Sequence, residues 1–121
     1  NTNGCTSLYT ASYGGHFDVA RLLLAKGADV NQATTTGASP LHVASGSGNL
    51  DVARLLLEQG ADVDQTKNNG ATPLAIASEK GHVDVAGVLL ANGASIDKAT
   101  HGGFTPLYVA FATEHLKLAR L

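Results

Sequence analysis

Histidine and cysteine are the residue types in this chain that most often bind zinc or transfer protons. A structural zinc ion takes about four nitrogen or sulfur ligands, and two histidines that share one helix face stand about four residues apart. The chain has a single cysteine, Cys5, and no two of its histidines are separated by four residues. We therefore predict neither a metal nor a cofactor from the histidines, which are His16, His42, His82, His101 and His115.

Three aspartates, Asp18, Asp51 and Asp84, are the candidates for acid–base chemistry. Catalysis needs a base or a nucleophile held in one unusual place, usually a cleft. These aspartates follow one another every 33 residues in similar surroundings, so they are three copies of one ordinary position. The glycine pairs at 14–15 and 102–103 fit neither G-x-x-x-x-G-K-[ST] nor a strand-flanked G-x-G-x-x-G. We predict that the chain is not an enzyme.

The interval of 33 residues runs through the whole chain without insertion or deletion. Glycines recur at positions 4, 37, 70 and 103, and a variant of T-P-L-x-x-A follows each of them. A fixed period of about 20–50 residues predicts a stack of supersecondary units, each of which is unstable alone.

This period and this motif resemble those of ankyrin repeats along the whole chain. The resemblance implies an all-α fold, an ankyrin-repeat solenoid of stacked helix-turn-helix units joined by β-hairpin loops. We expect a single ankyrin-repeat domain over residues 1–121. Its repeats are predicted at about 1–33, 34–66 and 67–99, with a truncated fourth at 100–121.

Each repeat carries the signals for two helices. A threonine or serine stands where the first helix needs an N-cap, and proline follows it in every repeat except the first. The second helix has an aspartate in its first turn and a glycine after its last. Its apolar run predicts that Val19 and Leu22 are buried together with their equivalents.

The resemblance gives structural roles to the polar residues inside the repeats. His16, Asn49 and His82 share one position with His115, where the side chain is expected to bond the adjoining backbone. His42 belongs to a T-P-L-H-type motif and receives the same interpretation.

Asn31 is a hydroxylation candidate. The run that ends at Asn31 resembles the context in which ankyrin asparagines are β-hydroxylated by an oxygen-sensing hydroxylase. The alternative is a hairpin residue that satisfies the local backbone.

Composition excludes two classes of partner and favours one kind of compartment. The net charge of −2 and the absence of a lysine/arginine cluster argue against nucleic acid as a partner. The longest apolar run, residues 85–91, is too short to span a membrane.

One cysteine excludes an internal disulfide and fits an intracellular location, either cytoplasmic or nuclear. The chain lacks an initial methionine and ends within a helical pattern, so we expect it to be a segment of a longer protein.

Function is expected on the surfaces that a repeat stack leaves free to vary. In the resembled family these are the concave face of the first helices and the hairpin tips, and both bind other proteins. The variable positions flank the repeated glycine and end the first helix, and Tyr13 and Phe104 are the leading aromatic anchors. For Phe104 the alternative is packing on the neighbouring hairpin. The predicted partner-binding residues are Asn3, Cys5, Tyr13, Thr36, Ser47, Asn69, Glu79, Lys80, His101 and Phe104.

Two further hypotheses concern partners. The centre of the variable strip is small and weakly polar, with Ala38, Gly46, Ser47 and Ala71, which leaves open a structural or engineered repeat scaffold that has no dedicated ligand. Solenoid ends normally carry a polar outer face, whereas the terminal helices here keep an apolar sequence. We therefore also predict self-association through uncapped ends.

Overall fold

The computed structural model describes residues 6–95, and these residues form six helices and no strand. The helices pair within the predicted repeats 1–33, 34–66 and 67–99, and the predicted fourth repeat lies outside the described residues. The helices are α1 (Ser7–Gly14), α2 (Phe17–Ala25), α3 (Pro40–Ser47), α4 (Leu50–Glu58), α5 (Pro73–Lys80) and α6 (Val83–Ala91).

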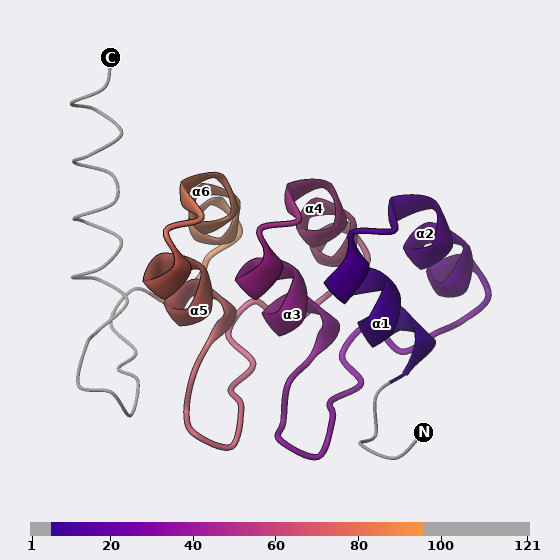
Figure 1. The fold of residues 1–121 in the computed structure, drawn as a ribbon, viewed down its shortest axis with the longest axis horizontal. Helices are drawn as coiled ribbons and strands as arrows, with labels where there is room; N and C mark the ends of the chain where they lie inside the picture. Colours follow the sequence, from indigo (N-terminus) through magenta and orange to yellow (C-terminus); the bar gives the residue numbers. More distant parts are fainter. Residues whose placement is uncertain (1–5, 96–121) are drawn as a thin grey trace.

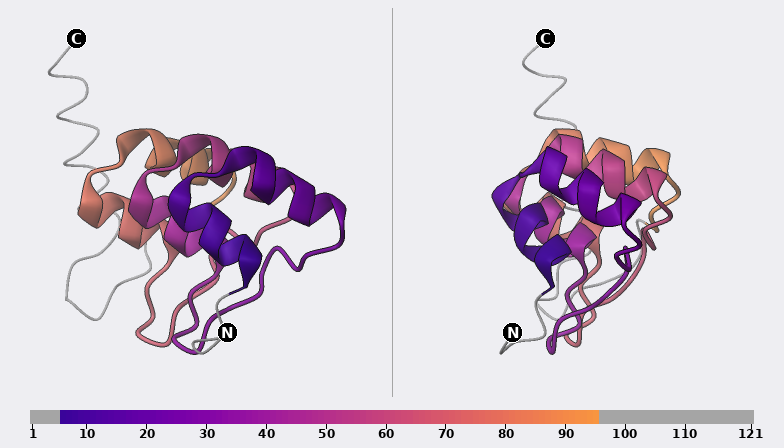
Figure 2. Two further views of the ribbon diagram at one scale, coloured as in Figure 1. Left: turned by 45° about the vertical axis from the view of Figure 1, so that its right-hand side comes forward. Right: turned by 90° about the vertical axis from the view of Figure 1, so that its right-hand side faces the viewer.

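The helices lie in two rows, with α1, α3 and α5 in one row and α2, α4 and α6 in the other (Figure 1). Each helix packs on its partner in the same repeat and on its equivalent in a neighbouring described repeat. The loops between repeats all project from the same side of the α1–α3–α5 row, as both views of Figure 2 also show. The predicted all-α stack is confirmed.

The first helix of each repeat begins where the sequence predicts. In α5 the amide of Ala75 donates to the Oγ1 atom of Thr72 at 3.1 Å, and equivalent bonds cap α1 and α3. Pro40 and Pro73 occupy the first helical position, where a missing N–H costs no helix bond. Local capping chemistry therefore fixes the start of these helices.

Gly48 shows why the first helix of a repeat ends in glycine. Its φ of 73° lies in the left-handed region, which disfavours residues with a side chain. A Cβ atom at Gly48 would also lie 2.8 Å from the imidazole ring of His82. That ring donates from Nε2 to the carbonyl oxygen of Gly46 at 3.1 Å, joining the third repeat to the second. The glycine thus provides both the turn and the space for this contact.

The core is a row of leucines that runs through the stack. Leu8, Leu41 and Leu74 come from the repeated motif, and each exposes 2% of its surface or less. Leu56 and Leu89 from the second helices are fully buried against them. Small residues allow the two rows to approach closely, and these are Ala11, Ala44 and Ala77 in the first helices and Ala20, Ala53 and Ala86 in the second.

The loops between repeats have hairpin turns without regular strands in the described part of the chain. The amide of Thr34 donates to the carbonyl oxygen of Ala38 at 2.9 Å, and Lys67 bonds Ala71 in the same way at 2.9 Å. One such backbone hydrogen bond closes each turn, although the segments on either side of the turn do not form a β ladder.

Candidate functional site

A shallow groove crosses the α1–α3–α5 row. Its volume is about 240 Å³. Side chains from three repeats contribute to it, so no single repeat contains the complete site. The lining residues are Tyr9 and Tyr13 from α1, Ala38, His42, Val43, Gly46 and Ser47 from the second repeat, and Lys67, Ile76 and Lys80 from the third.

Three of the predicted partner-binding residues meet in this groove. Tyr13, Ser47 and Lys80 come from α1, α3 and α5, and all three are exposed. Tyr13 is the most open, with 66% of its surface accessible. An exposed aromatic side chain in a groove resembles the anchors that dominate protein interfaces.

Other predicted positions lie apart from the groove. Thr36 and Asn69 are exposed at the loop turns, and Glu79 is exposed on α5 without lining the groove. The loops are held by the amide of Asn68, which donates to the carbonyl oxygen of Thr36 at 2.8 Å. The amide of Ala71 donates to Oδ1 of Asn69 at 3.0 Å. These residues belong to the loop surface and not to the groove.

The position after the repeated glycine is not an open surface in the described repeats. Ala38 and Ala71 expose only 5% and 6% of their surface, and each stands just before a first helix. Ala38 nevertheless lines the groove, and the prediction that this position belongs to the variable binding strip stays a prediction. Four predicted site residues lie outside the described residues, namely Asn3, Cys5, His101 and Phe104.

The sequence analysis missed four residues that line the groove, Tyr9, Val43, Lys67 and Ile76. Tyr9 stands four residues before Tyr13 and therefore on the same face of α1. That helical spacing is a signal that could have found Tyr9. Lys67 had no comparable signal, because it reaches the groove from the loop before α5.

His42 is part of the framework beneath the groove. It exposes 2% of its surface, and its Nδ1 atom lies 3.0 Å from the amide of Ser39, which can only donate. The ring proton therefore sits on Nε2, which donates to the carbonyl oxygen of Ala71 at 3.0 Å. Burial lowers the pKa of His42 to about 4, so the ring is neutral at pH 7. The predicted structural role of His42 is confirmed by these contacts.

The position shared by Asn49 and His82 joins consecutive repeats. Nδ2 of Asn49 donates to the carbonyl oxygen of Ser12 at 2.8 Å, in the last turn of the preceding first helix. His82 makes the equivalent bond to α3, as described above. The expected backbone bonding is confirmed at both positions. Within residues 6–95 no three histidine, cysteine, aspartate or glutamate side chains are grouped so that they could hold a metal ion.

Asn31 also links two repeats. Its Oδ1 atom accepts from the amide of Asp62, 31 residues away, at 2.8 Å, and its own amide donates to Asp29 at 2.9 Å. In the next loop Asp64 accepts from the amide of Ser95 at 2.9 Å. The side chain of Asn31 therefore bonds the following loop, whereas its backbone N–H is held within its own loop. Hydroxylation of Asn31 stays a prediction.

The outer surface of the first repeat is an apolar end face, formed by Val19 and Leu22. Val19 and Leu22 expose 50% and 58% of their surface, whereas their equivalents Val52 and Leu55 expose 1% and 6%. The predicted burial of Val19 and Leu22 is thus wrong. The same side chains are buried only where a preceding repeat covers them, as α2 covers α4.

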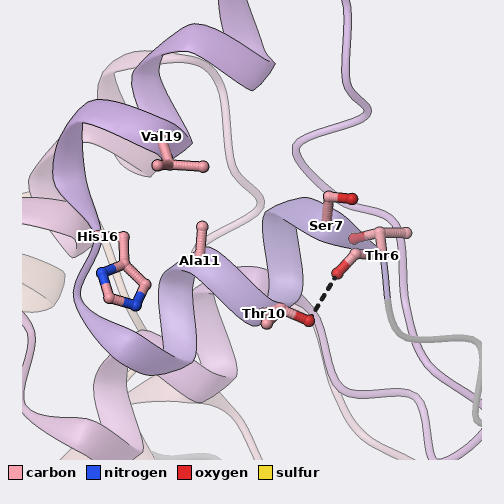
Figure 3. Close-up of a pocket in the computed structure, with 6 residues that line it drawn as sticks. All are labelled: Thr6, Ser7, Thr10, Ala11, His16 and Val19. Carbon is pink, nitrogen blue, oxygen red and sulfur yellow. Dashed lines mark hydrogen bonds between the residues drawn. The ribbon is translucent and has the colours of Figure 1, made fainter.

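A hollow of about 270 Å³ adjoins this end face, between α1 and α2. Figure 3 shows its lining, with His16, Ala11 and Val19 around one part and the N-terminal residues of α1 around the other. His16 occupies the position at which Asn49 and His82 bond a preceding repeat. In the second and third repeats the equivalent surface is therefore covered by the preceding repeat.

Comparison with known protein families agrees with this architecture. A family model described as ankyrin repeats in three copies matches residues 1–67 and 61–121. A comparison with curated proteins gives no match. None of the helices in the described residues is long and apolar enough to cross a membrane. Ankyrin repeats generally mediate protein–protein interactions and are typically non-catalytic. The chain belongs to the ankyrin-repeat family.

Proposed function

We propose that this chain binds another protein through the groove across α1, α3 and α5. One observation carries the proposal: exposed side chains of three successive repeats, Tyr13, Ser47 and Lys80, line the same groove. A surface assembled from three repeats fits a ligand that extends along the stack, such as a segment of polypeptide.

The dimensions of the groove also favour a protein ligand over a small molecule. At about 240 Å³ the groove is smaller than most small-molecule pockets, which measure about 300–1,000 Å³. Its walls offer aromatic and aliphatic contact through Tyr9, Tyr13, Val43 and Ile76. Such a surface accepts individual side chains of a partner.

Replacing Tyr13 with alanine tests this function. Truncating an aromatic anchor is expected to weaken binding by about 2 kcal/mol or more. Stability should change little, since Tyr13 is 66% exposed. The measurement is a titration of a partner recovered by affinity purification, combined with a thermal melt of each variant.

Phe17→Ala is the matched control for Tyr13→Ala. Phe17 is also a partly exposed aromatic residue, but it lies at the start of α2 and does not line the groove. Its truncation should leave the affinity unchanged. Equal affinity of Tyr13→Ala and wild type would refute binding at the groove and favour the alternative, a repeat scaffold without a dedicated ligand.

Self-association is a second candidate function, favoured by the end face. Val19 and Leu22 expose the apolar surface that their equivalents Val52 and Leu55 bury in the next repeat. We expect the apparent mass to rise with concentration, and Leu22→Lys to restore the monomer mass because it places a charge on this face. Sedimentation velocity across a concentration series is the measurement. Gln32→Lys adds the same charge on a loop and should have no effect, and a wild-type chain that stays monomeric would exclude this association.

A further inference from the structure

The two sides of the groove differ in chemical character. The α1 side presents Tyr9 and Tyr13, which stand four residues apart on one helix face. The α5 side presents Lys80, and Lys67 joins it from the preceding loop. Among the described residues these two lysines are the only charged groups that line the groove, because His42 is neutral at pH 7.

The charge of the two lysines is not neutralised within the described part of the chain. Neither lysine forms an ion pair with a carboxylate among residues 6–95. Glu79 precedes Lys80 on α5, but it does not line the groove. Lys80 also lies in the last turn of α5, where a cation complements the helix dipole. Lys67 has no such role, since it lies in a loop.

We infer that the groove selects an acidic segment of polypeptide, with an apolar side chain against Tyr9 and Tyr13 and a carboxylate against Lys67 and Lys80. This inference rests on the proposed function and names the chemistry of its partner. Charge complementarity supports it, because an anionic segment neutralises two ammonium groups that form no ion pair within residues 6–95. A basic segment would place like charges together, which costs affinity.

The helix spacing limits how far apart these two partner groups stand. Packed helices lie about 8–10 Å apart, so α1 and α5, with α3 between them, are separated by about 16–20 Å. Because Tyr13 and Lys80 line the same groove, this axis separation is an upper bound for the groups that they contact. An extended chain rises about 3.3 Å per residue, so the apolar residue and the carboxylate are expected at most about five or six residues apart.

Selection from a library of random peptides tests the inference with the whole 121-residue chain. We expect enrichment of peptides that carry aspartate or glutamate at this separation from an apolar residue. A synthetic peptide of this kind should bind about two- to fivefold more tightly than its asparagine or glutamine counterpart. Its affinity should also fall as salt is added.

Charge reversal in the chain provides the matched pair of variants. Lys80→Glu should weaken binding of the acidic peptide by about fivefold or more, and Lys67→Glu should act in the same direction. Lys26→Glu changes the net charge by the same amount on the C-terminal end of α2, away from the groove, and should leave the affinity unchanged.

The outcomes separate this inference from the proposed function. Acidic binders that lose affinity in Lys80→Glu and in Tyr13→Ala, but not in Lys26→Glu, would support both. Binders that depend on Tyr13 but show no preference for acidic residues and no effect of Lys67→Glu or Lys80→Glu would overturn the inference alone. If no selected peptide depends on Tyr13, both are wrong.

Discussion

Leu56→Ala is expected to lower the free energy of unfolding by about 2–5 kcal/mol. Leu56 is fully buried in α4, in the middle repeat of the described stack. Removing its side chain forfeits the transfer free energy of the missing carbons and leaves a cavity that the helices fill only in part. The middle repeat also contributes to two interfaces, so a defect in it weakens the stack on both sides. Denaturant unfolding followed by circular dichroism measures the loss.

Leu23→Ala is the matched control for Leu56→Ala. Leu23 holds the same repeat position in α2, but it is only half-buried because no repeat within residues 6–95 packs on the outer side of the first one. Its truncation removes the same atoms from a surface that is already partly hydrated, so the loss should be clearly smaller. Equal losses of unfolding free energy in the two variants would contradict the claim that packing between repeats buries this position.

Acid is expected to destabilise the chain through His42. Burial lowers the pKa of His42 to about 4 in the folded chain, against 6.5 for the ordinary side chain. Between these two values the unfolded chain binds a proton that the folded chain does not, so stability falls as the pH falls. The contribution is fully present above about pH 6.5 and is lost by about pH 4. A tenfold difference in proton affinity is worth about 1.4 kcal/mol, so the total effect is about 3 kcal/mol.

His42→Ala isolates this effect from other titrations. Alanine fills the equivalent position in α5 as Ala75, and the Thr72 cap still forms there. The variant should therefore keep its Ser39 cap, although it loses the bond from His42 to Ala71. Unfolding measured from pH 7 to pH 4 should show a steeper loss of stability in wild type than in His42→Ala. Parallel pH profiles would show that protonation of His42 does not oppose folding.

The helices could be predicted from the sequence because their ends are set by local chemistry. The hydroxyl of Thr72, the ring of Pro73 and the glycine at position 81 act within a few residues of one another. The contacts of Asn49 and His82 with the preceding repeat followed from the resemblance and are confirmed by their bonds.

Burial could be predicted only where a neighbour covers the residue. Val19 and Val52 occupy the same repeat position in the sequence, yet one exposes 50% of its surface and the other 1%. The difference comes from the repeat that packs against Val52, and the repeat pattern does not encode it. Ala38 occupies a position that looks variable in the sequence, yet it exposes only 5% of its surface while lining the groove.

The groove was predicted in part. The end of the first helix supplied Tyr13, Ser47 and Lys80, since these residues break the repeat pattern there. Lys67 could not be assigned, because the loop that brings it beside α5 is shaped by backbone bonds such as the one to Ala71. The positive charge that Lys67 and Lys80 give the groove could therefore be recognised only in the structure.

Amide chemical-shift mapping of the labelled chain during titration with the recovered partner tests the central claim most directly. Binding in the groove predicts the largest changes at Tyr13, Val43, Ser47 and Lys80, with small changes along α2, α4 and α6. Changes confined to α2, α4 and α6, with the groove residues unaffected, would contradict the assignment of the binding surface to the α1–α3–α5 row.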